Sequence, residues 1–204
     1  MELKVEDIQA GDVLLCYSRL TADERTAGST GYSHVAIALP GGRALQADKG
    51  VEVVSVESIF EEYDHIAVLR EATAHELWDD ERLQALEEFA TKQQGKPFNG
   101  MGLQRFPARK EKYADDLMER VEGYFEGTTA QVQSDRGLYF CSELITAAFI
   151  HVGIIHPSAA VVFTPETFSP SDIAKDKAFG FFRGYVKHSP DYVIPENDYF
   201  KSNL

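Results

Sequence analysis

The sequence has 204 residues, of which 44% are hydrophobic and 26% are charged, so it carries enough apolar material for one sizeable core and is not typical of a disordered protein. Acidic residues outnumber basic residues by 33 to 20, and the net charge of −13 disfavours nucleic acid and anionic lipid surfaces as partners, because like charges repel. No apolar run reaches the roughly 20 residues of a transmembrane helix, so we expect no transmembrane segment.

The first third of the chain predicts an antiparallel sheet. Short apolar or β-branched runs are separated by turn residues at Gly11-Asp12, Pro40-Gly-Gly42 and Lys49-Gly50, which is the pattern of a meander. The predicted strands are 13–17, 33–39, 44–47, 51–56 and 66–70. We therefore expect these strands to follow one another across one sheet.

The pattern then changes to helical spacing. Apolar residues recur among acidic ones from 75 to 94, and Gly95-Lys-Pro97 ends the run, which predicts an amphipathic helix. Residues 99–136 are rich in charge and carry one apolar stripe between Tyr113 and Phe125, and we interpret them as a helical insertion. The insertion is either a helix packed on the domain or a lid over a substrate. The sequence does not show whether the insertion is a packed helix or a lid.

The last part of the chain predicts a buried helix at 141–152 that ends at Gly153. A short helix at 171–174 and a strand at 179–186 follow, and the tail from His188 is expected to lie over the surface. These elements predict one domain at 1–187, which carries the insertion 99–136, and a C-terminal tail at 188–204.

Cys141 lies at the first turn of the predicted helix. Unpaired N–H groups and the positive end of the helix dipole both favour a thiolate there, and the same N–H groups can hold an oxyanion. The alternative is an inert buried thiol, since free cysteine is among the most buried residue types. Cys16 is the other of the two cysteines and is expected in the core. Two cysteines are too few for a disulfide framework, which indicates free thiols in a reducing compartment.

A thiol nucleophile needs an imidazole as proton acceptor and donor. Among the six histidines, His34 is the best candidate. Strand alternation places it on one face with Ala36 and Ala38, and these small side chains would let the Cys141 helix pack close to the imidazole. The alternative is a structural histidine whose hydrogen bonds are satisfied.

A third group usually orients the imidazole by accepting its other N–H, and the next strand offers Gln46 and Asp48 on one face. Gln46 is the first choice, because a neutral amide oxygen can fix the histidine tautomer, as asparagine does in papain-like sites. Asp48 is the reserve, since it adjoins Lys49-Gly50 and suits a turn. The histidine spacing indicates no metal site and the chain has no phosphate-binding glycine loop, so we expect no metal and no cofactor.

Three motifs in this order carry a family resemblance: Gly11-Asp-Val-Leu-Leu15, Ser33-His-Val-Ala-Ile37 and Phe140-Cys-Ser-Glu-Leu-Ile145. They resemble the circularly permuted NlpC/P60 papain-like enzymes, particularly the YiiX/YaeF-like branch, in which the histidine precedes the cysteine. Supporting matches are Gln46-Ala-Asp-Lys-Gly-Val51, Gly95-Lys-Pro-Phe-Asn99, Thr164-Pro165 and Ser169-Pro-Ser-Asp-Ile-Ala174. The resemblance covers the chain from about Gly11 to Val186.

The resemblance implies a papain-like α+β fold, with an antiparallel sheet or small barrel packed against helices. It also implies that Cys141 is the nucleophile and His34 the base. Where the family often carries a glutamate or a second histidine, this chain has Gln46. Family members include amidases and endopeptidases, so the resemblance implies a cysteine hydrolase that cleaves an amide bond in peptidoglycan-type peptides through a thioacyl enzyme.

The N-terminus lacks the basic and apolar regions of a secretory signal, so we expect a cytoplasmic protein as synthesised. Such an enzyme would act on a cytoplasmic substrate or would be delivered by a signal-independent secretion route, with a delivery or immunity partner.

One rival hypothesis is a lipid acyltransferase or thioesterase of the lecithin retinol acyltransferase type. It predicts an apolar tunnel lined by Phe98, Met101, Leu103, Phe106 and Phe163. The other rival is a non-catalytic binding module.

Overall fold

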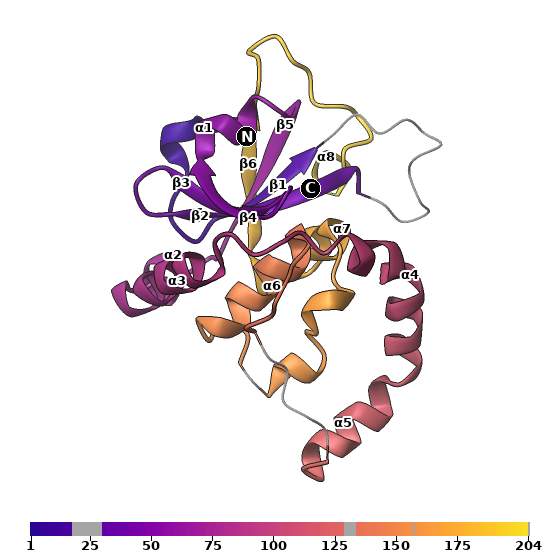
Figure 1. Cartoon of the computed structure of the whole chain (residues 1–204). Helices are drawn as coiled ribbons and strands as arrows, with labels where there is room; N and C mark the ends of the chain where they lie inside the picture. Colours follow the sequence, from indigo (N-terminus) through magenta and orange to yellow (C-terminus); the bar gives the residue numbers. More distant parts are fainter. Residues whose placement is uncertain (18–29, 129–133, 157, 204) are drawn as a thin grey trace.

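The computed structural model describes residues 1–17, 30–128, 134–156 and 158–203. In these ranges six strands form one antiparallel sheet in the order β4-β3-β2-β1-β5-β6, with helices packed around it (Figure 1). This arrangement confirms the predicted α+β class. The strands are β1 (Val13–Tyr17), β2 (Tyr32–Leu39), β3 (Arg43–Ala47), β4 (Val51–Ser55), β5 (His65–Arg70) and β6 (Phe181–Lys187).

The strand order follows the predicted meander only as far as β4. Each of the first three strands pairs antiparallel with the next. The chain then forms α1 (Val56–Phe60), and β5 pairs with β1 instead of β4, with Val13 opposite Leu69. β6 pairs with β5 from the far end of the chain. The expected order was therefore wrong at β5, because apolar runs predict strands but not their partners.

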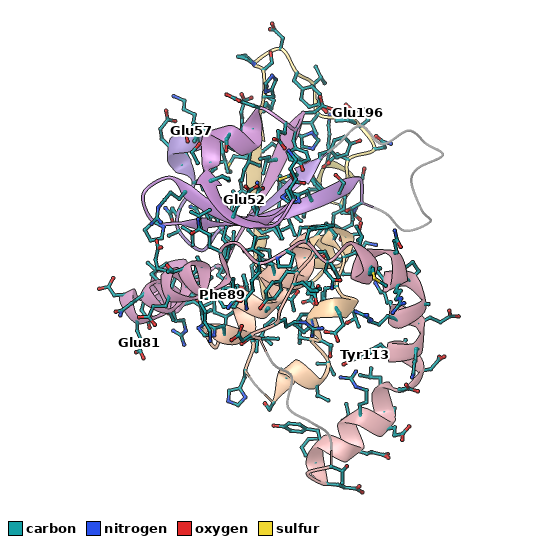
Figure 2. The ribbon with its side chains drawn as sticks, viewed as in Figure 1. Glu52, Glu57, Glu81, Phe89, Tyr113 and Glu196 are labelled. Atoms are coloured by element: carbon teal, nitrogen blue, oxygen red, sulfur yellow. The ribbon has the colours of Figure 1, made fainter. Side chains whose placement is uncertain are left out.

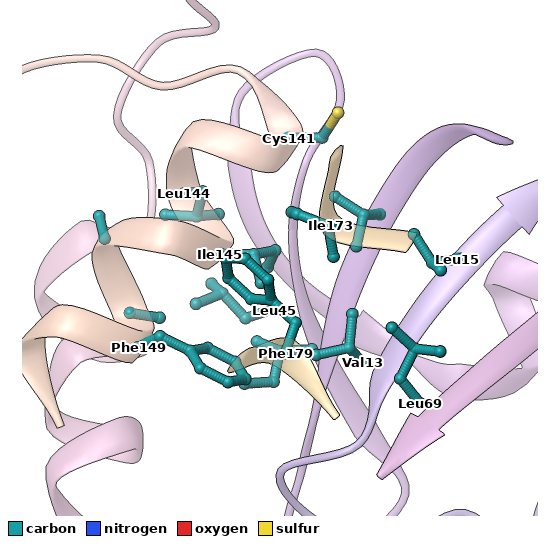
Figure 3. Close-up of a cluster of buried hydrophobic side chains, with 14 of the residues drawn as sticks. Val13, Leu15, Leu45, Leu69, Cys141, Leu144, Ile145, Phe149, Ile173 and Phe179 are labelled. Carbon is teal, nitrogen blue, oxygen red and sulfur yellow. The ribbon is translucent and has the colours of Figure 1, made fainter. Parts of the chain in front are cut away.

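Both faces of the sheet are buried, and different helices cover them (Figure 1). One face packs against α6 (Cys141–His151) and α3 (Asp80–Gln93). This core includes Val13, Leu15, Leu45, Leu144, Ile145 and Phe149 (Figure 3). A fully buried side chain of this size contributes about 2 kcal/mol, so the core holds α6 firmly against the sheet.

The Cys141 helix covers the face opposite to the expected one. Ala36 and Ala38 pack with Val56 and Ile59 in a second cluster, on the α1 side of the sheet. α6 packs on the other side, where Ile37 and its neighbours lie. The expectation was wrong because alternation separates the two faces of a strand without showing which helix covers each.

The predicted helix 75–94 is two helices, α2 (Ala74–Leu77) and α3. Asp79 begins α3, because its carboxylate accepts a hydrogen bond from the Arg82 N–H and so caps the helix. Trp78, just before it, turns into the core. A Cβ atom at Gly11 would lie only 2.4 Å from the Trp78 ring, so this approach requires glycine.

The described part of the insertion contains two helices, α4 (Gly100–Asp115) and α5 (Leu117–Phe125), where one was expected. They form an arm that curves past the segment between α6 and α7 (Figure 1). The Tyr113 hydroxyl is hydrogen-bonded to Thr164 and fastens the middle of the arm to that segment. Residues 129–133 of the predicted insertion lie outside the described part of the chain.

The C-terminal part of the chain is short helical turns and an anchored tail. The further helices of the described residues are α7 (Pro170–Lys175), α8 (Tyr199–Ser202) and the 3-10 turns Ala159–Val161, Pro165–Thr167 and Lys177–Phe179, and another 3-10 turn, Val5–Asp7, lies near the N-terminus. Asp198 is fully buried. It accepts hydrogen bonds from the hydroxyls of Tyr32, at 2.8 Å, and Tyr185, and lies 3.3 Å from His65 Nε2. The expectation that the tail only lies over the surface was therefore wrong for this end.

Candidate active site

Cys141 is the first residue of α6, and the residue is 8% exposed. The β2–β3 pairing runs from Ile37 to Leu39, away from the site, and beyond it a pocket opens between Ser33 and His34 of β2 and Ala47 at the end of β3. Cys141 lines this opening. The backbone N–H groups of Val35 and Ser142 donate hydrogen bonds to its sulfur. The sulfur is therefore held between a strand end and a helix N-terminus.

His34 lies near the start of β2, directly opposite Cys16 of β1. The register of the two strands shifts between Cys16 and Tyr17, which makes Ser33 an extra residue on β2. The imidazole is hydrogen-bonded to the Cys141 side chain. Its Nε2 atom lies 2.9 Å from Gln46 Oε1, which leaves Nδ1 for the thiol. The structure thus brings the predicted Cys141, His34 and Gln46 together in that order.

Gln46 and Asp48 contribute to the site in different ways. Extending the β2–β3 register places Gln46 diagonally across from His34 on the same face, within reach of a long side chain. Gln46 makes the hydrogen bond to the imidazole. Asp48 lines the pocket beside His34, and its charge helps to raise the pKa of the imidazole.

The thiol and the imidazole each stabilise the charged form of the other. Burial raises the pKa of Cys141, but the hydrogen bond and charge of His34 and the N–H groups of Val35 and Ser142 lower it, and the net direction is down. Burial lowers the pKa of His34, but Cys141, Gln46 and Asp48 raise it, and the net direction is up. Opposite shifts in a contacting pair favour a thiolate–imidazolium ion pair.

Tyr63 is a residue of the site that the sequence analysis missed. Its ring stacks on the His34 imidazole, with the ring centres 5.7 Å apart and the planes 2° from parallel. The stacking restricts the rotation of the imidazole out of its plane with Cys141 and Gln46. Tyr63 lies in the connection before β5, and no motif in the sequence marks it.

Cys16 is buried in the core, as predicted. Burial raises the pKa of its thiol, and the negative charges of Cys141 and Glu62 raise it further. The S–H group lies 3.7 Å from the Leu14 carbonyl, to which it donates. The two cysteines therefore differ in chemistry: the pKa of the Cys16 thiol is raised, whereas that of the Cys141 thiol is lowered.

The pocket beside Cys141 has a volume of about 200 Å³ and one apolar wall. Phe98, Leu103 and Phe106, three of the five residues named for an apolar tunnel, line it. The other two lie elsewhere: Met101 is 63% exposed, and Phe163 stacks on Phe168 of the core, with ring centres 5.4 Å apart. The polar lining includes Ser33, Asp48, Ser142 and Ser169.

A larger cavity of about 590 Å³ lies farther along α4. Lys110 and Tyr113 line it from α4, and Phe168 and Asp172 from the other side. The Cys141 pocket uses the same two walls, through Phe106 on α4 and through Ser169 and Pro170. The two hollows are therefore neighbours along one side of the arm, and the smaller one holds the reactive groups.

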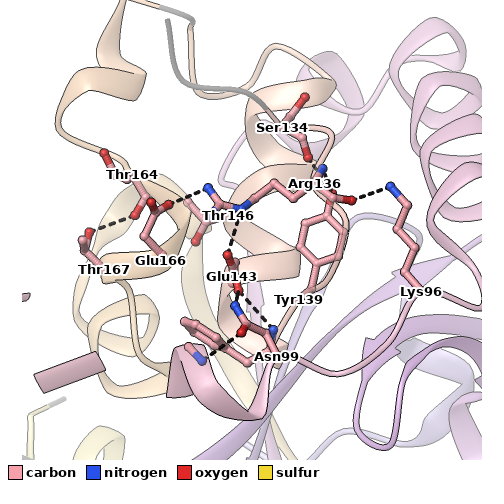
Figure 4. Close-up of polar contacts among 12 residues, drawn as sticks. Lys96, Asn99, Ser134, Arg136, Tyr139, Glu143, Thr146, Thr164, Glu166 and Thr167 are labelled. Carbon is pink, nitrogen blue, oxygen red and sulfur yellow. Dashed lines mark hydrogen bonds and ion pairs between the residues drawn. The ribbon is translucent and has the colours of Figure 1, made fainter. Parts of the chain in front are cut away.

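A buried polar network supports the start of α6 (Figure 4). Glu143 Oε2 accepts hydrogen bonds from the Phe140 N–H at 3.2 Å and from Asn99 Nδ2 at 3.0 Å. Arg136 Nε lies 2.9 Å from Glu143 Oε1, and Arg136 Nη1 lies 2.8 Å from Glu166. Burial raises the pKa of Glu143, while Asn99 and Arg136 act against this shift. The network ties the insertion to the helix that begins with Cys141.

Within the described ranges, no helix is both long and apolar enough to cross a membrane. Among the same residues, no three His, Cys, Asp or Glu side chains are grouped so that they could hold a metal ion. Comparison of the chain with protein-family models, with curated proteins and with solved structures finds no match.

Proposed function

We propose that the chain is a cysteine hydrolase of the permuted NlpC/P60, papain-like type, which cleaves an amide bond. The observation that carries the proposal is the contact of the Cys141 thiol with the His34 imidazole at a helix N-terminus, with Gln46 on the other imidazole nitrogen. Nucleophile, base and orienting group within hydrogen-bond reach are the signature of nucleophilic catalysis.

The reaction follows from this geometry in two steps. The Cys141 thiolate attacks the carbonyl carbon and forms a C–S bond, and the carbonyl electrons move to the oxygen, where N–H groups at the start of α6 can stabilise the charge. The carbonyl then re-forms, the C–N bond breaks, and His34 protonates the leaving amine. In the second step, His34 takes a proton from water, which attacks the thioester and releases the acid and Cys141.

The pocket and its neighbourhood fit an elongated substrate. The apolar wall of Leu103 and Phe106 lies beside Cys141, and the larger cavity continues along α4. A peptide from peptidoglycan is the proposed substrate class, on the strength of the sequence resemblance. Action in the cytoplasm or delivery by a signal-independent route, with a delivery or immunity partner, belongs to the same proposal.

The apolar wall also favours a second candidate function. A fatty acyl chain in thioester linkage would place its carbonyl at Cys141 and its chain along Phe98, Leu103 and Phe106. The same thiol and imidazole would then transfer the acyl group to water or to another acceptor.

One experiment separates these functions from a non-catalytic binding module. The purified protein is incubated with peptidoglycan fragments and, separately, with a long-chain acyl thioester, and products and protein adducts are followed by mass spectrometry. The proposal predicts release of an amine from the peptides and a transient acyl mass on Cys141, both absent in Cys141→Ala. Turnover of the thioester alone would favour the second candidate. A lack of turnover and of any adduct with both substrates would contradict a catalytic role.

A further inference from the structure

We propose that Glu52, on β4, is a positioning residue of this site, which fixes the orientation of the Gln46 amide and thereby the tautomer of His34. The inference rests on the proposed function, because it assigns Glu52 a part in the same reaction. Glu52 touches neither the thiol nor the imidazole, so it acts only through Gln46.

The strand ladder places Glu52 and Gln46 side by side. The two residues are direct partners in the β3–β4 pairing, and partners in an antiparallel ladder present their side chains on the same face. Gln46 Nε2 donates a hydrogen bond to Glu52 Oε1 at 3.0 Å. Neighbouring strands β2, β3 and β4 thus supply His34, Gln46 and Glu52 in a hydrogen-bonded row, with Glu52 at the end away from the thiol. Figure 2 labels Glu52 on the sheet.

The donors and acceptors in this row allow only one arrangement. An ionised carboxylate only accepts hydrogen bonds, so Glu52 requires the NH₂ end of the Gln46 amide. The amide oxygen must then face His34, and because this oxygen also only accepts, Nε2 of His34 must carry a hydrogen. In the neutral imidazole, Nδ1 is consequently the unprotonated nitrogen, which can accept a proton from the thiol.

Without Glu52, the Gln46 amide would lose this constraint. An amide reversed by half a turn would present its NH₂ end to His34 Nε2 and would favour the other tautomer, with the proton on Nδ1. That tautomer cannot accept a proton from Cys141, so any population of it removes enzyme from the reactive state. Cys141, Asp48 and Tyr63 also face or border the imidazole. The acceptor to which Gln46 Nε2 donates in the described structure, however, is Glu52.

The test compares Glu52→Gln with Glu57→Gln. A glutamine at position 52 keeps the size of the side chain but can offer either a donor or an acceptor to Gln46. Glu57 is an exposed residue in the first turn of α1, so its substitution changes the net charge equally without touching the row. We expect kcat to fall about tenfold in Glu52→Gln with KM unchanged, as for other supporting residues. We expect no change in Glu57→Gln.

A spectroscopic measurement makes the test independent of activity. In a Cys141→Ala background at about pH 8.5, where imidazole is normally neutral, nitrogen-15 NMR reports which nitrogen of His34 is protonated. We expect the Nε2–H tautomer in this background and with Glu57→Gln, and a mixture of tautomers with Glu52→Gln. The same single tautomer with Glu52→Gln would overturn the inference. If Glu52→Gln changes the tautomer but the wild-type protein shows no hydrolase activity, the role of Glu52 is supported and the proposed function is contradicted.

Discussion

The Cys141 thiol and the His34 imidazole meet at the opening between β2 and β3, and each raises the charged population of the other. Two features of the backbone make the meeting possible. Cys141 is the first residue of its helix, and the Val35 N–H of β2 is directed at the sulfur. The reactive pair is therefore built where a helix begins and a strand ladder ends.

Gln46 and Asp48 can be told apart as the orienting group by substitution. Gln46→Ala removes the acceptor of the imidazole N–H, and we expect kcat to fall by about 10- to 100-fold with an unchanged KM. Asp48→Asn removes only the weakest of the named contributions to the pKa of His34, and we expect a smaller loss of kcat, about threefold or less. Steady-state kinetics check both variants. A loss in Asp48→Asn as large as that in Gln46→Ala would make Asp48 the third residue of the site.

Asp198 anchors the C-terminal tail, and its substitution tests how strongly. Asp198→Ala leaves Tyr32, Tyr185 and His65 without their shared acceptor in a buried place, and losing one partner of such a cluster costs about 3 to 5 kcal/mol. Urea denaturation measures the free energy of unfolding. Asp191→Ala, at an exposed position of the same tail, is the control and is expected to change it by about 0.5 kcal/mol or less.

The pH dependence of this anchor has a definite sign. Burial by itself raises the pKa of Asp198, but its hydrogen bonds from His65, Tyr185 and Tyr32 lower it, and the net direction is down. A carboxylate with a lowered folded-state pKa stabilises the fold above its unfolded pKa, and this contribution is lost as the pH falls through the folded value. We expect wild type and Asp198→Ala to differ most near neutral pH and to converge in acid. A constant difference down to strongly acidic pH would contradict this.

Arg136 forms an ion pair with a buried carboxylate, whereas Lys92 forms one with an exposed carboxylate. Arg136→Met leaves Glu143, which is fully buried, without its cation, and we expect a loss of about 3 kcal/mol in unfolding free energy. Lys92→Met breaks an exposed pair with Asp135, which is worth about 0.5 kcal/mol. Chemical denaturation of both variants gives the comparison. Equal losses would show that the Glu143 network does not hold the start of α6.

Leu103 and Met101 provide a matched pair for testing the apolar wall. Both are exposed apolar residues in the first turn of α4, but only Leu103 lines the Cys141 pocket. We expect Leu103→Ser to raise KM for an apolar or peptide substrate several-fold, about 1 kcal/mol of lost contact, and to leave the stability within about 0.5 kcal/mol. Met101→Ser should change neither quantity. A rise in KM with both variants would indicate a general effect on the arm.

Much of this site could be predicted from the sequence, because each of these parts of the site is marked by a short local pattern. The start of the Cys141 helix, the strand of His34 and the side-chain alternation that aligns Gln46 with it can all be read from short stretches. Glu52 was not found, because its role depends on the β3–β4 register, which direct pairing with Gln46 reveals only in three dimensions. Tyr63 was missed for a related reason, since its ring reaches His34 from a loop.

The fold was predicted in its elements and less well in their connections. Apolar runs located the strands. The pairing of β5 with β1, however, depends on the path that the chain takes across the sheet after α1, which the runs do not show. The error about Ala36 has the same origin. Both faces of β2 are buried, so the sequence offers no polar side to show which face the Cys141 helix covers. Likewise, the buried role of Asp198 depends on three partners from distant strands.

The central claim, that His34 activates Cys141, is tested most directly by the rate of alkylation of Cys141 with iodoacetamide as a function of pH, followed by peptide mass spectrometry. Only the thiolate reacts, and an ordinary thiol with a pKa near 8.5 is only a few per cent ionised at about pH 7. Because the pKa of Cys141 is lowered, we predict rapid labelling already near neutral pH in the wild type. The profile should move to higher pH in His34→Ala, and Cys16 should stay unlabelled. Slow labelling of Cys141 at neutral pH, with the same profile in His34→Ala, would contradict the account.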